Sequence, residues 1–220
     1  MKIIIIGGKG TAVNIADQIT NAQIAHGARH EFLGFCIDDL SLGDSINGYP
    51  VLCNTQELLD KFGGISDVKF IFALYKPEKM KERTELLASY RIPATKFCNF
   101  IHPTSYLSSH VDIGFGNVIL SHCSIHSNVK IGNFNIINSN VVVEHDSSMK
   151  NNNYLAASAC VGSNIQLDNG IFIGLNSAIR ENVTLHDYAF VGMGSNVLTD
   201  VKPNAIVFGN PARSTYDNRT

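Results

Sequence analysis

One histidine, His145, lies in the segment VVVEHDSSMKNNNYLAASACVG, residues 141–162, among many asparagine and serine residues. An imidazole ordinarily titrates near pH ~6.5, so a histidine in a binding site can accept a proton at neutral pH and act as a general base. Asparagine and serine are also frequent at tight turns. The segment therefore has two interpretations: His145 is a catalytic base, or it is a polar residue at an exposed corner.

A glycine-rich turn near the N-terminus has the residue types that bind phosphate. Gly7, Gly8 and Gly10 follow the apolar run KIIII and precede a helix-like segment, an arrangement that lets main-chain N–H groups approach a pyrophosphate. Asp38 and Asp39 end the next strand-like segment, where carboxylates can bind a ribose or a base edge. The third glycine of a dinucleotide fingerprint is absent, which argues against a redox dinucleotide and favours a nucleotide sugar.

The elements that position these residues change character near residue 97. Residues 1–97 alternate strand-like and helix-like segments, an order that predicts a small parallel α/β unit. From there on, every sixth position is aliphatic or Met, which predicts a hexapeptide repeat. The sixteen positions are Leu107, Ile113, Ile119, Ile125, Ile131, Ile137, Val143, Met149, Leu155, Val161, Leu167, Ile173, Ile179, Leu185, Val191 and Val197.

Each repeat also predicts a corner. Eleven of the sixteen residues that lie three places after the aliphatic positions are Asn, Asp or Gly, which adopt left-handed backbone conformations at low cost. Asn117, Asn135 and Asn153 are spaced eighteen apart, which is three repeats of six. The spacing predicts about five triangular coils, stacked at the ~4.8 Å strand spacing, with these asparagines in a hydrogen-bonded ladder inside. The fold class is thus α/β plus β. Burial of the repeat row does not match the entropy of ordering the coils, so we expect a homo-oligomer, a trimer.

The composition excludes several classes of partner. The chain has 220 residues and a formal charge of −2, with no basic run, which argues against nucleic acid and anionic membrane as partners. The apolar opening is too short for a signal peptide or a membrane span, so we expect a cytoplasmic protein. The five cysteines form no CxxC pair and are odd in number, so we expect small buried hydrophobes and no metal site. They are Cys36, Cys53, Cys98, Cys123 and Cys160.

The chain resembles the bacterial nucleotide-sugar acyltransferases similar to sialic acid O-acetyltransferase and to the bacillosamine and perosamine N-acetyltransferases. The resemblance covers nearly the whole chain and rests on GGKGTA, GFCIDD, NFIHPTSYLS, the repeat, VVVEHD and VFGNPAR. It implies a Rossmann-like nucleotide-sugar-binding domain at 1–97. It also implies a left-handed parallel β-helix acyltransferase domain with a C-terminal tail at 98–220, which forms a homotrimer and binds acyl-CoA between subunits. The implied reaction transfers an acyl group, acetyl from acetyl-CoA, to the amino group of a nucleotide-linked amino sugar in surface glycan (lipopolysaccharide) biosynthesis.

The resemblance also implies roles for single residues. His145 matches the general base of a direct attack on the thioester, and Asp146 matches an acidic residue that orients the imidazolium, although Asp146 also occupies the corner column. One coil further, the N–H of Ser163 is in place to stabilise an oxyanion. The acyl-CoA channel would be lined by Gly174, Leu175, Gly192, Met193 and Pro211, of which the glycines are structural in either case. The nucleotide-sugar site would include Gly8, Gly10, Thr11, Asp38 and Asp39.

The sequence departs from the family pattern at two positions. Relatives commonly have His where this chain has Thr11, and many have a second His where this chain has Tyr154. In addition, ALYKPEKMKE replaces a Gly-Asn-containing segment expected near the nucleotide sugar. The acceptor sugar is therefore not defined. The EHD segment favours N-acylation, and sugar O-acetylation is the alternative.

Two further functions compete with acyl transfer. A γ-type carbonic anhydrase needs three histidines around zinc, and His122, His126 and His145 are the only candidates, at three different repeat positions. A non-catalytic trimeric nucleotide-binding module is the alternative from another class. The complete EHD segment argues against it.

Overall fold

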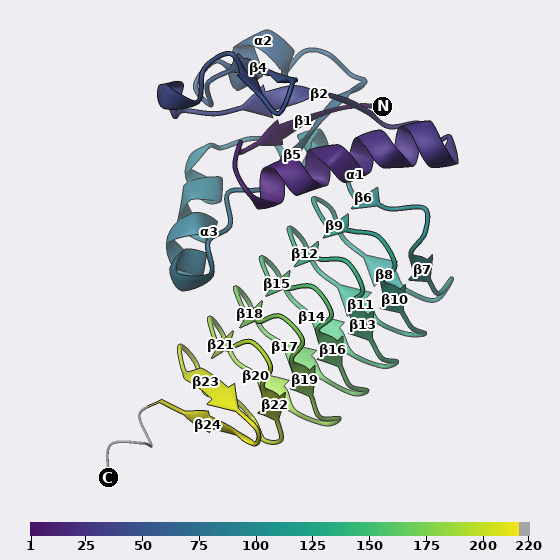
Figure 1. Cartoon of the computed structure of the whole chain (residues 1–220), viewed down its shortest axis with the longest axis vertical. Coiled ribbons are helices and arrows are strands. Elements are labelled where there is room, and N and C mark those ends of the chain that lie inside the picture. Colours follow the sequence, from purple (N-terminus) through teal and green to yellow (C-terminus); the bar gives the residue numbers. More distant parts are fainter. Residues whose placement is uncertain (216–220) are drawn as a thin grey trace.

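A small parallel sheet begins the chain in the computed structural model, which describes residues 1–215 (Figure 1). Four strands pair in parallel in the order β4-β2-β1-β5, and a fifth, β3, pairs antiparallel with β4. Their bounds are β1 (Lys2–Ile6), β2 (Glu31–Cys36), β3 (Ser45–Ile46), β4 (Tyr49–Cys53) and β5 (Val68–Phe72). The helices are α1 (Thr11–His26), α2 (Leu58–Phe62) and α3 (Met80–Ser89), with short 3₁₀ turns η1 (Leu40–Leu42), η2 (Pro77–Lys79) and η3 (Ala94–Lys96).

Side-chain alternation along β1 decides which helix covers which face of this sheet. Ile3 and Ile5 pack in one cluster with residues of α1, whereas Ile4 and Ile6 pack in another with residues of α2 and α3. Successive side chains of a strand point to opposite faces, so an unbroken apolar strand requires cover on both sides. The first cluster also contains Val118 and other residues of the second unit, which places α1 between the sheet and the coils (Figure 1).

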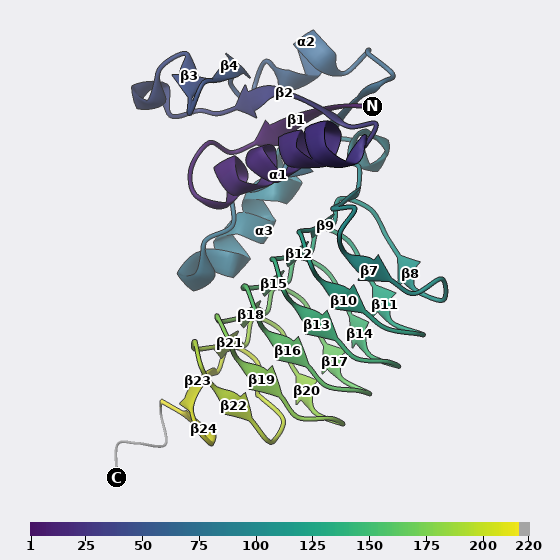
Figure 2. The ribbon, with the colours of Figure 1, turned by 45° about the vertical axis from the view of Figure 1, so that its right-hand side comes forward.

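The second unit is a parallel β-helix built from two-residue strands in three faces. Face 1 contains β6 (Phe100–Ile101), β9 (Val118–Ile119), β12 (Ile136–Ile137), β15 (Tyr154–Leu155), β18 (Phe172–Ile173), β21 (Phe190–Val191) and the closing hairpin β23 (Ile206–Gly209) and β24 (Ala212–Ser214). Face 2, in front in Figure 2, contains β7 (Tyr106–Leu107), β10 (Ser124–Ile125), β13 (Val142–Val143), β16 (Cys160–Val161), β19 (Ala178–Ile179) and β22 (Asn196–Val197). Face 3 contains β8 (Asp112–Ile113), β11 (Lys130–Ile131), β14 (Ser148–Met149), β17 (Gln166–Leu167) and β20 (Thr184–Leu185).

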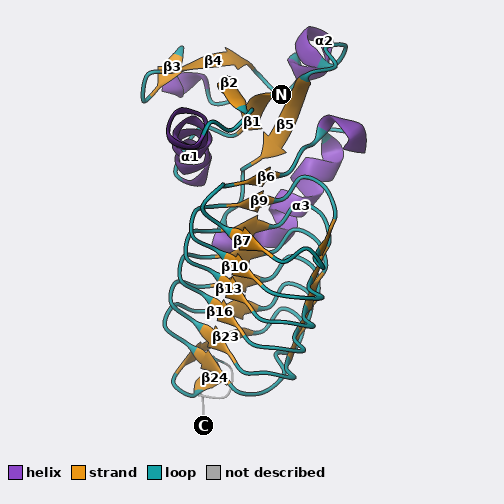
Figure 3. Ribbon diagram, turned by 90° about the vertical axis from the view of Figure 1, so that its right-hand side faces the viewer, coloured by secondary structure: helices purple, strands orange, loops and turns teal. Residues whose placement is uncertain are grey.

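The register of the strands confirms the coil of eighteen residues. Ser124 pairs with Val142, and Val142 with Cys160, in parallel, so each strand stacks on the strand one coil away (Figure 3). The strands β6 to β20 complete five coils, as the repeat predicts. All sixteen repeat residues lie in one core, in which Leu107 and Ile113 are only partly buried. The α/β plus β fold class is therefore confirmed.

The predicted corners are also present. Fourteen of the sixteen corner residues have positive φ, and only His110 and Asp200 do not. Phe134 at φ 57° is the least expected of them, because a bulky side chain strains this region. Its ring lies over Gly116, one coil earlier, where an added Cβ would come within 2.6 Å of the ring. The missing side chain at Gly116 thus makes room for the aromatic corner.

The asparagine ladder forms inside the prism as expected. Asn117, Asn135 and Asn153 are fully buried. The Asn135 amide Nδ2 donates to Asn117 Oδ1 at 3.0 Å, and the Asn153 backbone N–H donates to Asn135 Oδ1 at 2.9 Å. The ladder therefore satisfies main-chain N–H groups at a corner that carries no strand pairing, whereas Nδ2 of Asn153, at its end, is buried without a partner among residues 1–215.

Side chains of α1 fasten the first unit to face 1. The Gln18 amide donates to Ser139 Oγ at 3.0 Å and its oxygen accepts from the Ser121 N–H at 2.8 Å. At the start of the helix, the hydroxyls of Thr11 and Tyr154 lie 3.0 Å apart. These contacts hold the glycine turn at a defined position on the β-helix.

The cysteine prediction is wrong for one residue. Four cysteines are buried, but Cys160 is exposed, because it is the first residue of β16 and the first residue of each coil strand points outward. No helix within residues 1–215 is long and apolar enough to cross a bilayer.

Candidate active site

His145 lies at the corner between face 2 and face 3, after β13 and before β14. Its side chain is 53% exposed, and its Nδ1 lies 2.7 Å from Oδ2 of Asp146. An ionised carboxylate accepts a hydrogen bond from Nδ1–H, which leaves the lone pair on Nε2. The corner therefore presents to solvent an imidazole in the form that can accept a proton.

Asp146 acts both as a corner residue and as the partner of the imidazole. Its backbone is left-handed, with φ 60°, and its Oδ1 accepts a hydrogen bond from Asn128 Nδ2 at 2.9 Å. The Asn128 amide, and after it His145, lower the pKa of the Asp146 carboxyl below its ordinary value. The carboxyl of Asp146 is thus an ionised carboxylate at neutral pH.

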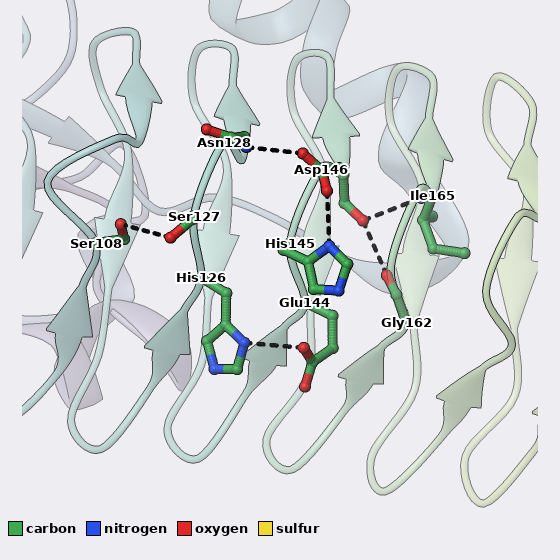
Figure 4. Close-up of polar contacts among 10 residues, drawn as sticks. Ser108, His126, Ser127, Asn128, Glu144, His145, Asp146, Gly162 and Ile165 are labelled. Carbon is green, nitrogen blue, oxygen red and sulfur yellow. Dashed lines mark hydrogen bonds and ion pairs between the residues drawn. The ribbon is translucent and has the colours of Figure 1, made fainter.

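A shallow depression opens on this corner, and Figure 4 shows the polar side chains of this region. Larger grooves lie between α3 and face 1 and at the C-terminal end of the coils, and neither contains His145. The depression is lined by Tyr106, His126, Ser127, Asn128, His145 and Asp146. It is open to solvent along one side of the prism, as expected if another molecule has to complete it.

A second imidazole–carboxylate pair in this region was missed by the sequence analysis. His126 Nδ1 lies 2.9 Å from Glu144 Oε2, and His126 Nε2 lies 3.0 Å from Ser124 Oγ. Figure 4 shows this pair beside the pair formed by His145. The separation of eighteen residues between His126 and Glu144 is the signal that could have revealed it, since it places them on adjacent coils of one face.

Ser163 lies where the repeat predicts, one coil beyond His145. The next N–H, that of Asn164, donates to the His145 carbonyl at 3.2 Å. Within residues 1–215 the Ser163 N–H itself has no hydrogen-bond partner. It is therefore a free main-chain donor on the coil that follows the coil of His145.

The residues expected to line an acyl-CoA channel lie at another corner, between face 1 and face 2. Leu175 and Met193 are 51% and 76% exposed, and they are one coil apart. Gly174 and Gly192 donate their N–H groups to the next coil, and Cβ atoms on them would come within 2.5 and 2.8 Å of neighbouring atoms, so both glycines are required for packing. Pro211 lies further along, in the β23–β24 hairpin. One chain does not bring these residues to His145.

The glycine turn forms the predicted strand-to-helix connection. Gly10 precedes α1 with φ 53°, and an added Cβ on Gly8 would come within 2.7 Å of Ile46. Gly8, Lys9 and Gly10 line a depression together with Val13, Asn14, Asp17, Leu42, Ile46 and Asn47. Thr11 points elsewhere, to its contact with Tyr154 on face 1.

The two aspartates after β2 have different partners. Asp38 accepts hydrogen bonds from the Thr55 N–H at 2.7 Å and from the Thr55 hydroxyl, and it lines a separate depression near α2 and α3. Asp39 lies 2.9 Å from the Lys9 ammonium. Hydrogen bonds from Ser41, and then from Lys9, lower the pKa of Asp39 to about 2. Only Asp39 therefore has a direct connection to the glycine turn.

The residues of the zinc alternative do not converge. Within residues 1–215, no group of three His, Cys, Asp or Glu side chains has a geometry that could hold a metal ion. His122 is a left-handed corner residue, whereas His126 and His145 are each paired with a carboxylate.

The small α/β unit and the stacked coils together define a class of fold: a left-handed parallel β-helix preceded by a short N-terminal β/α region, as found in solved acetyltransferase structures. The chain matches no protein-family model, and no curated protein sequence matches it significantly. Solved structures match it over nearly its whole length. A variant of perosamine N-acetyltransferase from Caulobacter crescentus, in complex with CoA and GDP-perosamine, has a TM-score of 0.81 at 23% identity and covers 98% of this chain and 97% of its own.

Two other solved structures have the same architecture. The acetyltransferase domain of PglB from Neisseria gonorrhoeae, in complex with acetyl coenzyme A, has a TM-score of 0.82 at 23% identity, covering 97% of this chain and 98% of that one. WeeI from Acinetobacter baumannii AYE has a TM-score of 0.79 at 25% identity, covering 97% and 100%. The left-handed β-helix expected from the resemblance is thereby confirmed.

Proposed function

We propose that this protein transfers an acyl group, acetyl in the simplest case, from acyl-CoA to the amino group of a nucleotide-linked amino sugar. The observation that carries the proposal is the exposed His145–Asp146 pair, 2.7 Å apart. It lies at a corner of a β-helix whose fold is shared, over 98% of this chain, with a perosamine N-acetyltransferase that binds CoA and GDP-perosamine.

His145 is the general base of the proposed reaction. An amine that attacks a thioester must lose a proton, and the Nε2 atom is the unpaired nitrogen of this imidazole. Asp146 holds the ring and stabilises the imidazolium. The free Ser163 N–H would donate to the carbonyl oxygen as it becomes an oxyanion, a contribution worth about 3 kcal/mol in comparable sites. The attack is direct, without a covalent acyl-enzyme.

The main chain supplies the binding groups for the donor. The N–H groups of Leu175 and Met193, at the corner between faces 1 and 2, occupy the same position in their six-residue repeats as the Ser163 N–H does in its own, and within residues 1–215 they too have no hydrogen-bond partner. Main-chain donors in a row can bind the amide carbonyls of a pantetheine arm. Gly8 and Gly10 are proposed to hold the diphosphate of the acceptor, with Asp39 and Lys9 beside it.

The arrangement of these groups favours a homotrimer. His145 lies between faces 2 and 3, whereas Leu175 and Met193 lie between faces 1 and 2 and the glycine turn lies beside face 1. A second copy, packed corner to corner, would bring the base of one chain to the donor and acceptor sites of its neighbour. Homo-oligomers with closed symmetry satisfy such an arrangement in every subunit.

The test is an acyl-transfer assay. The protein is incubated with acetyl-CoA and a panel of nucleotide-linked 4-amino sugars and matching hydroxyl sugars, and free thiol and product mass are measured. We expect release of CoA with an amino acceptor. Release only with hydroxyl acceptors would indicate an O-acetyltransferase, and no release with any acceptor would favour the nucleotide-binding module. Light scattering of the purified protein tests the trimer.

A further inference from the structure

In the proposed reaction the acceptor nitrogen loses two protons, but only one base, His145, has been assigned to take them up. A primary amine is largely an ammonium ion at neutral pH, because its pKa lies well above 7. To become an amide, its nitrogen must lose one proton to become nucleophilic and a second as the C–N bond forms. The thiolate of CoA takes back only one. A hydroxyl acceptor, by contrast, loses a single proton, so a second base beside His145 would be a feature of an enzyme for amines.

The second imidazole–carboxylate pair is in place for this role. His126 Nδ1 donates to Glu144 Oε2 at 2.9 Å, and the two side chains are 35% and 37% exposed. His126 lines the same depression as His145. Glu144 immediately precedes His145 in the chain, so Glu144, His145 and Asp146 lie on one coil and His126 lies on the neighbouring coil (Figure 4).

The groups around His126 suit a neutral base that becomes charged for a short time. Ser124, on the same strand segment, contacts Nε2 at 3.0 Å, and the Tyr106 ring meets the imidazole edge-on, with centroids 6.5 Å apart. Beyond Glu144 lies Cys160, whose pKa is raised by partial burial and then by the Glu144 carboxylate, so the thiol stays neutral. His145 and Asp146 complete the surroundings. The carboxylate of Glu144 thus directly stabilises an imidazolium at position 126.

We propose that His126, supported by Glu144, is a second proton acceptor that converts the bound ammonium of the acceptor into the free amine. This inference rests on the proposed function. Nε2 of His126, which the Ser124 hydroxyl contacts in the free protein, takes one proton from the ammonium. The amine then forms the C–N bond with the thioester carbon, and His145 takes the second proton. The C–S bond breaks, the thiolate takes the proton of His145, and His126 later releases its own to water.

His126→Asn is the principal variant. An asparagine amide can still donate to Glu144 but cannot accept the ammonium proton. We expect kcat/KM for the amine acceptor to fall 10- to 100-fold at pH 7. Below the pKa of the acceptor amine, the variant should lose tenfold per pH unit, because only the free amine reacts, and it should approach the wild type at higher pH. Glu144→Gln should lower the activity in the same direction by a smaller factor, and it carries the test if His126→Asn does not fold.

His186→Asn is the matched control. His186 Nδ1 pairs with Asp168 at 3.0 Å, but this pair lies on face 3, outside the depression, and its loss should leave the pH profile unchanged. The inference is overturned if the wild type acylates amines but the His126→Asn and Glu144→Gln variants keep the wild-type pH profile. In that case the proposed function itself still holds. A wild type that leaves every amine acceptor unreacted would contradict the proposed function itself.

Discussion

The hydroxyl groups of Thr11 and Tyr154 lie 3.0 Å apart, although 143 residues separate them in the chain. Both stand where relatives of the resembled family commonly have histidine. The two departures from the family pattern therefore contact each other, and the pair joins the first residue of α1 to the first residue of β15. Thr11 and Tyr154 thus form one contact at the junction between the glycine turn and the β-helix.

This contact should be measurable as a coupling energy. A partly buried hydrogen bond between neutral groups contributes about 0.5–1.5 kcal/mol to the free energy of unfolding. We expect Thr11→Val and Tyr154→Phe each to lower it by about 1 kcal/mol, and the double variant to lose less than the sum. Urea unfolding of the four proteins supplies the cycle. Strict additivity would show that the hydroxyls do not interact.

His145→Ala should reduce turnover by at least ~100-fold while acyl-CoA binding is retained. The reason is that the side chain removes a proton in the transition state, whereas the main-chain donors proposed to bind acyl-CoA lie at another corner. Steady-state kinetics and calorimetric binding of CoA check the two halves. The control is His186→Asn, another histidine paired with an aspartate. A variant that loses CoA binding as strongly as turnover would assign His145 a structural role.

Asp38→Ala should raise the KM of the acceptor and leave the KM of acyl-CoA unchanged. Asp38 follows β2, at the edge of the sheet where nucleotides bind in parallel α/β folds, but it also accepts hydrogen bonds from Thr55. The matched control is Asp67→Ala, which removes only the exposed pair with Lys2. If the acceptor KM does not move and only the melting temperature falls, Asp38 serves the Thr55 turn and not the ligand.

The carboxyl of Asp146 should titrate below the ordinary aspartate range. Its folded pKa is lowered, first by the Asn128 amide and then by His145. The stabilisation from these contacts is therefore present above the unfolded pKa, near ~3.9, and is lost as the pH falls through the folded value. Carbon NMR of the side-chain carboxyl measures this pKa directly. Asn128→Ala should raise it toward the ordinary value, and no change would show that the amide does not reach the carboxylate.

Asn135→Ala should destabilise the β-helix strongly. Asn135 is fully buried, its amide donates to the Lys150 carbonyl at 3.0 Å, and its oxygen accepts from the Asn153 N–H. The buried Asn153 N–H and the Lys150 carbonyl would both lose their hydrogen bonds to this side chain, at a cost of about 2–4 kcal/mol. The control is Asn182→Gly, at an exposed left-handed corner with φ 60°, which should change stability by less than about 0.5 kcal/mol. Equal effects of the two substitutions on stability would show that the ladder hydrogen bonds do not stabilise the β-helix.

Several features of the site follow from the repeat alone. The positions of His145 and Ser163 on adjacent coils and the left-handed backbone of Asp146 were predicted from spacings of six and eighteen. His126 and Glu144 have the same spacing of eighteen, so this pair could also have been predicted from the sequence. Its polar members occupy outward positions that the aliphatic row does not mark, which is why the pattern of apolar residues did not reveal it.

Other features had no signal in the sequence. Asp38 and Asp39 are adjacent in the chain, yet one is held by Thr55 and the other by Lys9, because the chain turns between them. The exposure of Cys160 likewise depends on which strand residue faces outward. The boundary near residue 97 stays a prediction, and η3 and β6 lie on either side of it.

By itself, the sequence determined the periodic part of this protein: the coils, their corners, the asparagine ladder and the place of the histidine at a corner. These depend on parallel strands stacking at one constant interval, so counting along the chain is enough. Only the tertiary structure decided how α1 lies on face 1, that Thr11 meets Tyr154, and that the imidazole and the glycine turn face different sides of one chain. Such relationships arise from the fit between two differently shaped surfaces, and no interval along the chain encodes that fit.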